Sequence, residues 1–146
     1  MSEQTEGSIE IASTPEALMA VICDFDAYPE WTVGIQKAEV TKWDSKGRPT
    51  EVAFEVSQMG IGASYTLAYR YRPRLGGVSW TTKSASGAVK DIRGEYSLEP
   101  SGEGTKVTYR TTVEPAIPLI GFLKRQAERT IINTALQGLK DRAEGL

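Results

Sequence analysis

The sequence predicts an α+β domain in which a curved antiparallel sheet of six to seven strands wraps around a long C-terminal helix. From residue 35 to residue 113, apolar residues alternate with polar ones, which is typical of antiparallel strands with one buried and one solvated face. The segments between these runs are short and contain glycine, as β-hairpins require. From Ile117 to Leu146 the apolar residues instead recur with the period of an α-helix.

The N-terminal part predicts one short strand followed by a helix. Residues 8–11 alternate and fit a first strand. Thr14 stands before Pro15, so Thr14 can cap a helix that begins at the proline and continues to about Cys23. Segment 13–16 can alternatively form a capping box. Either arrangement places a helix directly after the first strand.

Segment 24–31 is rich in aromatic residues and is interrupted by Pro29. It predicts a loop or a short second helix that carries Phe25, Tyr28 and Trp31. A large ring on such a segment has two interpretations. Trp31 either plugs the core or gates the entrance of a cavity.

The strands of the predicted sheet follow from alternation with a period of two. The clearest runs are 51–57, 65–72, 78–82, 92–99 and 106–113. Hairpin connections are expected at 45–47, 60–62, 75–77, 84–87 and 101–104. The residues whose parity predicts that they face the terminal helix are Val52, Phe54, Leu67, Tyr69, Trp80, Tyr96, Val107 and Tyr109.

The terminal helix carries small or hydroxylated residues along the face expected to meet the sheet. These are Ala127, Thr130, Thr134 and Gly138. Small residues there either allow close packing or leave a space. The facing strands supply many Tyr and Trp rings, whose polar tips are uncommon in a dry core. Ligand pockets are typically apolar and aromatic with a few placed polar groups, so the combination predicts a cavity between sheet and helix.

Composition excludes several classes of function. The chain of 146 residues suits one domain spanning residues 1–146, of which residues 1–7 are expected to be flexible. Its net charge of −2 provides no basic surface for binding nucleic acid. It has no histidine, which argues against His-based triads and common zinc sites, so no metal site or cofactor is predicted. Cys23 is the single cysteine. Without an apolar run for a signal peptide or membrane span, a cytoplasmic location is expected.

Local motifs resemble a known superfamily along essentially the whole chain. They are Asp-Ala-Tyr-Pro-Glu-Trp at 26–31, the paired strands 94–100 and 104–109, and the helix segments 117–129 and 135–142. In these segments the chain resembles the START-like or SRPBCC superfamily, in its polyketide cyclase/dehydrase and lipid transport branch. The resemblance implies the helix-grip fold, with a deep hydrophobic cavity between the sheet and the last helix.

The resemblance implies that Tyr28 and Trp31 lie near the cavity entrance. It places four residues deeper, namely Tyr69, Trp80, Tyr96 and Thr134. No catalytic residue is assigned. The candidate ligand-binding residues come from the resemblance, from the aromatic residues of the predicted inner sheet face and from the small residues of the terminal helix. They are Tyr28, Trp31, Phe54, Tyr69, Trp80, Tyr96, Tyr109, Ala127, Thr130 and Thr134.

Three functions agree with this fold. The first is binding or transport of a hydrophobic small molecule, such as a lipid, an isoprenoid or a polyketide-like compound, by a monomer or weak homodimer. The alternative is a polyketide cyclase, aromatase or dehydratase. The aromatase branch uses placed arginines, but Arg70, Arg72, Arg93 and Arg110 all have outward parity here, which favours the first function. A lesser alternative is a protein-interaction module of the co-chaperone-activator type.

Overall fold

The computed structural model describes residues 5–32, 34–58, 61–116 and 121–145. The strands are β1 (Thr5–Ile11), β2 (Ile35–Trp43), β3 (Pro49–Gln58), β4 (Ile61–Tyr71), β5 (Gly77–Gly87), β6 (Val89–Ser101) and β7 (Gly104–Pro115). The helices are α1 (Pro15–Cys23), η1 (Phe25–Ala27), α2 (Tyr28–Trp31), η2 (Pro73–Leu75) and α3 (Gly121–Ala143). The strands form one sheet in the order β1-β7-β6-β5-β4-β3-β2. Every neighbouring pair is antiparallel, which confirms the predicted fold class.

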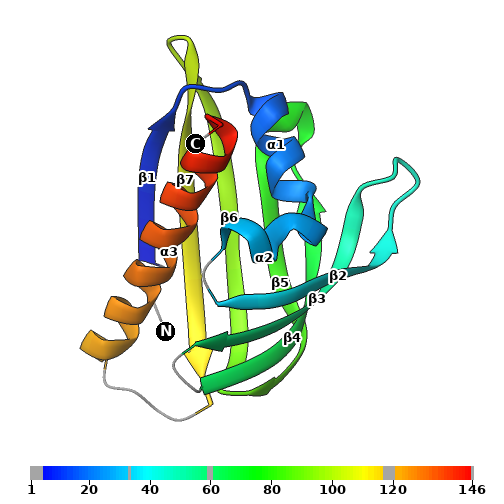
Figure 1. Cartoon of the computed structure of the whole chain (residues 1–146), viewed down its shortest axis with the longest axis vertical. Helices are drawn as coiled ribbons and strands as arrows, with labels where there is room; N and C mark the ends of the chain where they lie inside the picture. The colour runs from blue at the N-terminus through cyan, green and yellow to red at the C-terminus, as the bar shows by residue number, and fades with distance from the viewer. Residues whose placement is uncertain (1–4, 33, 59–60, 117–120, 146) are drawn as a thin grey trace.

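Two groups of helices cover the concave face of the curved sheet (Figure 1). The long helix α3 packs against β1 and β7, and α1 lies beside it. The short elements η1 and α2 lie against β2. The C-terminal helix therefore shares the cover of the sheet with α1 and η1, because Leu18 and Ile22 of α1 and Phe25 of η1 are also buried and need the same sheet face.

The predicted parity of the strands is confirmed. The residues expected on the inner face are all buried, with exposed fractions from 0% for Val52 to 9% for Tyr69. The outer face carries the charges, where the Arg110 Nε lies 2.6 Å from a Glu6 carboxylate oxygen and Arg72 pairs with Glu95. Some inner residues meet η1 instead of α3. The ring of Phe25, for example, lies 5.0 Å from that of Tyr69.

The local elements agree with the sequence near α1 and differ at one turn. The Thr14 hydroxyl accepts a hydrogen bond from the Ala17 amide at 3.2 Å, so Thr14 caps α1. Strand β1 begins at Thr5, earlier than expected, and its first residues therefore belong to the sheet. The turn predicted at 84–87 is wrong, because these residues extend β5 and pair with residues 63–66 of β4.

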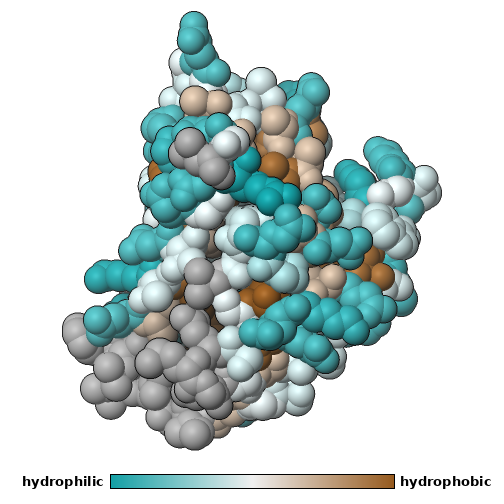
Figure 2. Space-filling model, in the orientation of Figure 1, coloured by the Kyte–Doolittle hydropathy of each residue, from teal (hydrophilic) through white to brown (hydrophobic). Residues whose placement is uncertain are grey.

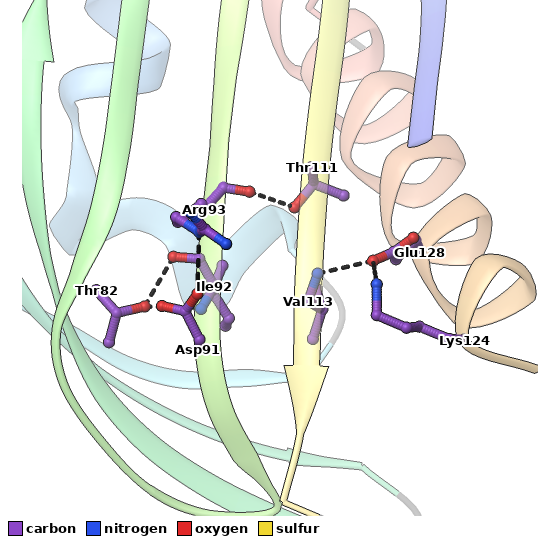
Figure 3. A network of polar contacts seen from close by, with 8 residues as sticks. All are labelled: Thr82, Asp91, Ile92, Arg93, Thr111, Val113, Lys124 and Glu128. Atoms are coloured by element: carbon purple, nitrogen blue, oxygen red, sulfur yellow. Dashed lines mark hydrogen bonds and ion pairs between the residues drawn. The ribbon is translucent and has the colours of Figure 1, made fainter. Parts of the chain in front are cut away.

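Strands β5 and β6 are paired over a short length only. Their register covers Gly77–Trp80 against Gly94–Ser97. Further along, the Thr82 hydroxyl donates to the Ile92 carbonyl at 2.8 Å and accepts from the Ile92 amide at 2.7 Å. Figure 3 shows the hydroxyl bond to the carbonyl. A side chain thus links the two strands where their backbone pairing has ended.

Helix α3 presents a different face to the sheet from the one predicted. Its buried residues are Glu128, Ile132, Leu136 and Leu139, whereas Ala127 is exposed. With about 100° between successive helical residues, the mean direction of this face is turned from that of the expected one by about 150°. Leu and Ile gain more than Ala or Thr from leaving water, so they take the contacts with the sheet. The predicted helix start at 117–120 lies outside the described residues.

Candidate ligand cavity

A cavity of about 310 Å³ lies between the concave sheet face, α2 and the middle of α3. Near the centre of the face in Figure 2, hydrophobic surface shows between hydrophilic side chains. The cavity is lined by Ile22, Tyr28, Trp31, Thr32, Gly34, Ile35, Phe54, Val56, Ser57, Tyr65, Leu67, Tyr69, Trp80, Val89, Ile92, Tyr96, Tyr109, Thr111, Val113, Thr130, Ile131, Thr134 and Ala135. None of these described residues carries a charged side chain.

A continuous series of aromatic rings forms the inner wall. The Tyr69 and Trp80 rings lie 5.9 Å apart on neighbouring strands, and Trp80 lies 5.5 Å from Tyr96 and 5.4 Å from Tyr109. Tyr96 and Tyr109 meet edge to face at 4.8 Å. Such tilted and edge-to-face contacts stabilise aromatic pairs beyond their buried area. The rings therefore hold one another in place and form a rigid wall.

Two glycines make room for the tryptophans. Gly94 stands opposite Trp80 in the β5–β6 register, and a Cβ there would lie 2.8 Å from the Trp80 ring. On α3, a Cβ at Gly138 would lie 3.2 Å from the ring of Trp31. The contact at Gly94 is too close for a side chain unless a neighbour shifts, and the contact at Gly138 is tighter than most Cβ contacts. Glycine at these positions therefore leaves room for the two indoles.

The hydroxyls of the cavity tyrosines differ in their partners. The Tyr28 hydroxyl donates to the Ile22 carbonyl at 2.5 Å. Among the described residues, no hydrogen bond engages the hydroxyls of Tyr65, Tyr69, Tyr96 or Tyr109. They are also not among the fully buried polar atoms that lack a partner in the described part of the chain, so these hydroxyls face open space.

These hydroxyls stay protonated. Burial raises the pKa of Tyr65 to about 12. Burial also raises the pKa of Tyr69, Tyr96 and Tyr109, and neighbouring tyrosines raise the pKa of Tyr69 and Tyr109 further. A phenol that keeps its proton can donate a hydrogen bond but cannot act as a base. The cavity therefore offers several neutral donors.

Trp31 borders the cavity next to α3. Its ring lies 5.1 Å from that of Tyr28. Its Nε1 is buried and has no hydrogen-bond partner among the described residues. A buried N–H without a partner is rare and destabilising. Trp31 thus packs on the core and still lacks one polar contact.

A buried carboxylate fastens α3 to the sheet beside the cavity (Figure 3). Glu128 accepts a hydrogen bond from the Val113 amide at 2.7 Å and from Lys124 Nζ at 2.8 Å. It also accepts one from the Thr5 hydroxyl at 2.6 Å. Because Val113 lines the cavity, this cluster fixes the distance between α3 and the cavity wall.

The structure brings together all but one of the residues that the sequence proposed as ligand contacts. Ala127 is the exception, since the rotation of α3 places it on the exposed side of the helix and outside the cavity lining. Sequence reasoning did not propose Thr32 or Gly34, which belong to no periodic segment. It also did not propose Thr111 or Val113, although their parity matches that of Tyr109 and could have identified them.

Other kinds of site find little support in the described residues. They contain no group of three or more acidic, Cys or His side chains that could hold a metal ion. Cys23 lies outside the cavity lining, 3.7 Å from the Tyr71 hydroxyl, and burial raises the pKa of its thiol. A thiol with a raised pKa is a poor nucleophile. No helix in the described ranges has the length and apolar character that crossing a membrane requires.

Comparison with known proteins places the chain in a family. Residues 2–144 match the family model described as polyketide cyclase/dehydrase and lipid transport. No curated protein sequence matches the chain.

Solved structures share the fold at low sequence identity. A START superfamily protein from Mycobacterium smegmatis is 19% identical, with 99% of each chain covered and a TM-score of 0.89. A protein from Thermus thermophilus is 19% identical, with 98% of each chain covered and a TM-score of 0.79. The Zhui aromatase/cyclase from Streptomyces sp. R1128 is 14% identical, with 97% of this chain and 93% of that chain covered and a TM-score of 0.73.

Proposed function

The chain belongs to the polyketide cyclase/dehydrase and lipid transport family, and on this premise we propose that it binds and carries a hydrophobic small molecule. The observation that carries the proposal is the cavity of about 310 Å³, whose described lining is aromatic and aliphatic and holds no charged side chain. Cavities of about 300–1,000 Å³ with apolar walls and few polar groups are the usual sites for small ligands. The candidate contacts are the sequence-proposed residues that line it, from Tyr28 to Thr134.

A second function, as a polyketide cyclase, aromatase or dehydratase, is favoured by the tyrosine hydroxyls. Neutral donors such as Tyr96 and Tyr109 could polarise a ketone of a bound chain. Cyclisation also needs a base to remove a proton next to that ketone. The raised pKa of these tyrosines disfavours them as bases, and the described lining offers no carboxylate. These observations support a carrier over an enzyme.

A third function, as a protein-interaction module, would use the outer face of the sheet. There Arg72 already pairs with Glu95, and Arg93 pairs with Asp91. Charges that are paired internally offer less to an external partner. This leaves the interaction module as the lesser alternative.

Titration with N-phenylnaphthylamine, a neutral dye that fluoresces in apolar surroundings, tests the proposal. We expect a saturable rise in fluorescence with one dye per chain, and displacement of the dye by uncharged hydrophobic compounds. Absence of saturable binding contradicts the proposed function. To separate carrier from cyclase, the protein is incubated with a poly-β-ketone thioester. Recovery of the unchanged compound supports the carrier, whereas a cyclised or dehydrated product in the mass spectrum supports the enzyme.

A further inference from the structure

The cavity contains more hydrogen-bond donors than its own walls satisfy. The hydroxyls of Tyr65, Tyr69, Tyr96 and Tyr109 have no partner among the described residues. Tyr96 and Tyr109 are directly paired across β6 and β7, so their side chains enter the same space from adjacent strands. Buried hydroxyls are normally hydrogen-bonded. A ligand with acceptor atoms at this wall would satisfy them.

The cavity offers no charge to balance an anion. Lys124 pairs with Glu128 at 2.8 Å, and Arg110 pairs with Glu6 at 2.6 Å on the outer face of the sheet. Arg125 and Arg129 lie on the exposed side of α3. The described lining contains no Lys or Arg. Burying a carboxylate without a cation is strongly unfavourable, even when hydroxyls donate to it. A fatty acid therefore fits this site poorly.

Size and wall shape favour a compact ring system. The volume of about 310 Å³ is near the lower end of the range for ligand pockets. The rings of Trp80, Tyr96 and Tyr109 surround the inner end with flat and edge-on surfaces. Flat aromatic molecules pack well against such walls.

We infer that the cavity selects an uncharged, compact ring compound that bears carbonyl, ether or hydroxyl oxygens, in preference to a carboxylate or a plain hydrocarbon. This inference rests on the proposed function, because it names the chemical class of the ligand bound in the same cavity. Its distinguishing element is the group of unpartnered hydroxyls on Tyr69, Tyr96 and Tyr109.

Three probes with one ring skeleton test the inference. They are fluorene, the neutral ketone fluorenone and fluorene carboxylate, and their dissociation constants are measured by quenching of protein fluorescence. Fluorene is the most hydrophobic, so a cavity without oxygen recognition would bind it best. We expect fluorenone to bind about three- to tenfold more tightly than fluorene, since a neutral hydrogen bond contributes modestly to affinity. The carboxylate should bind about tenfold or more weakly than fluorene.

A double variant, Tyr96→Phe with Tyr109→Phe, removes two hydroxyls and keeps both rings. We expect it to lose most of the preference for fluorenone while fluorene binds within about twofold of the parent. Tyr71→Phe is the matched control, because the Tyr71 hydroxyl donates to the Pro49 carbonyl and Tyr71 does not line the cavity. The control should keep the preference.

The outcomes separate the two proposals. If the parent binds fluorene as tightly as fluorenone, or binds the carboxylate best, the inference is overturned and the proposed function stands. If none of the three probes nor N-phenylnaphthylamine binds, the proposed function fails, and this inference fails with it. A fluorenone preference that survives in the double variant also overturns the inference, since other groups would then recognise the oxygen.

Discussion

The two ends of the strand pair β6–β7 share one alternating pattern but form different interiors. At the closed end, which is near the C-terminus of α3 in Figure 1, Leu98 and Val107 pair, and both belong to the same buried cluster as Leu139. Val107 and Leu139 have exposed fractions of 0%. At the open end, Ile92 and Val113 pair and line the cavity. The alternation makes a sheet face, and the covering residues decide whether that face is filled or hollow.

The helix accounts for much of the difference. Toward its C-terminus, at the closed end, α3 presents Leu139, whose side chain is fully buried. Near the open end it presents Thr130, Thr134 and Ala135, which border the cavity without filling it. Exposed Ile131, at 40%, stands at the same border.

The largest effect is expected from Leu139→Ala at the closed end. Removing a fully buried leucine from a packed region leaves a cavity and should lower the free energy of unfolding by about 2–5 kcal/mol. Urea denaturation followed by circular dichroism measures this. Val113→Ala at the open end should cost clearly less, because Val113 already borders empty space. Equal costs at the two positions would contradict the difference in packing.

Glu128→Gln should have the next largest effect, about 1–3 kcal/mol, because it weakens the charged hydrogen bonds that fasten α3 between the two ends. Burial by itself raises the pKa of Glu128, but the three hydrogen bonds it accepts outweigh this and hold the pKa below its usual value. Its contribution to stability is therefore present above the unfolded pKa of about 4.3 and is lost as the pH falls through the folded pKa.

The difference in stability between parent and Glu128→Gln, measured by denaturation at several pH values, should thus be full at neutral pH and shrink below about pH 4. A difference that is constant down to strongly acidic pH would show that the carboxylate charge is not what fastens the helix.

Thr134→Phe should affect binding far more than stability. Thr134 borders the cavity, so a phenyl ring can occupy empty space, and the melting temperature should stay within a few degrees of the parent. Binding of N-phenylnaphthylamine should be lost. Arg125→Ala, on the exposed side of α3, serves as the control and should change neither property. Lys124 is unsuitable as a control because it pairs with Glu128.

The smallest expected effect concerns the ionisation of the tyrosines at mildly alkaline pH. All 6 tyrosines have a raised pKa, and burial is the first cause in each case. The absorbance of tyrosinate should therefore stay flat in the folded protein through about pH 10, where the urea-unfolded chain titrates.

Because the folded pKa exceeds the unfolded one, this contribution to stability is full below about pH 10 and is lost as the pH rises through the folded pKa. Titration of even one tyrosine at its ordinary pKa in the folded protein would mean that its hydroxyl is in contact with bulk water.

The sequence predicted the sheet well because alternation reports directly which side chains share a face. Tyr69, Trp80 and Tyr109 were placed correctly for this reason. It predicted the phase of α3 less well. Ala127 and Leu136 both lie on a broad, weakly amphipathic arc, and only packing against the sheet decides between them. The turn at 84–87 was predicted wrongly because glycine and serine also tolerate a long strand when β4 continues beside them.

We expect the open end of the molecule to bind a ligand and the closed end to bind none. Amide chemical shifts measured by NMR during titration with N-phenylnaphthylamine test this most directly. The shifts should concentrate at open-end residues such as Gly34, Val113 and Thr134, while Leu98, Val107 and Leu139 change little. Shifts centred on the closed end or on the outer face of the sheet, or no shifts at saturating dye, would contradict it.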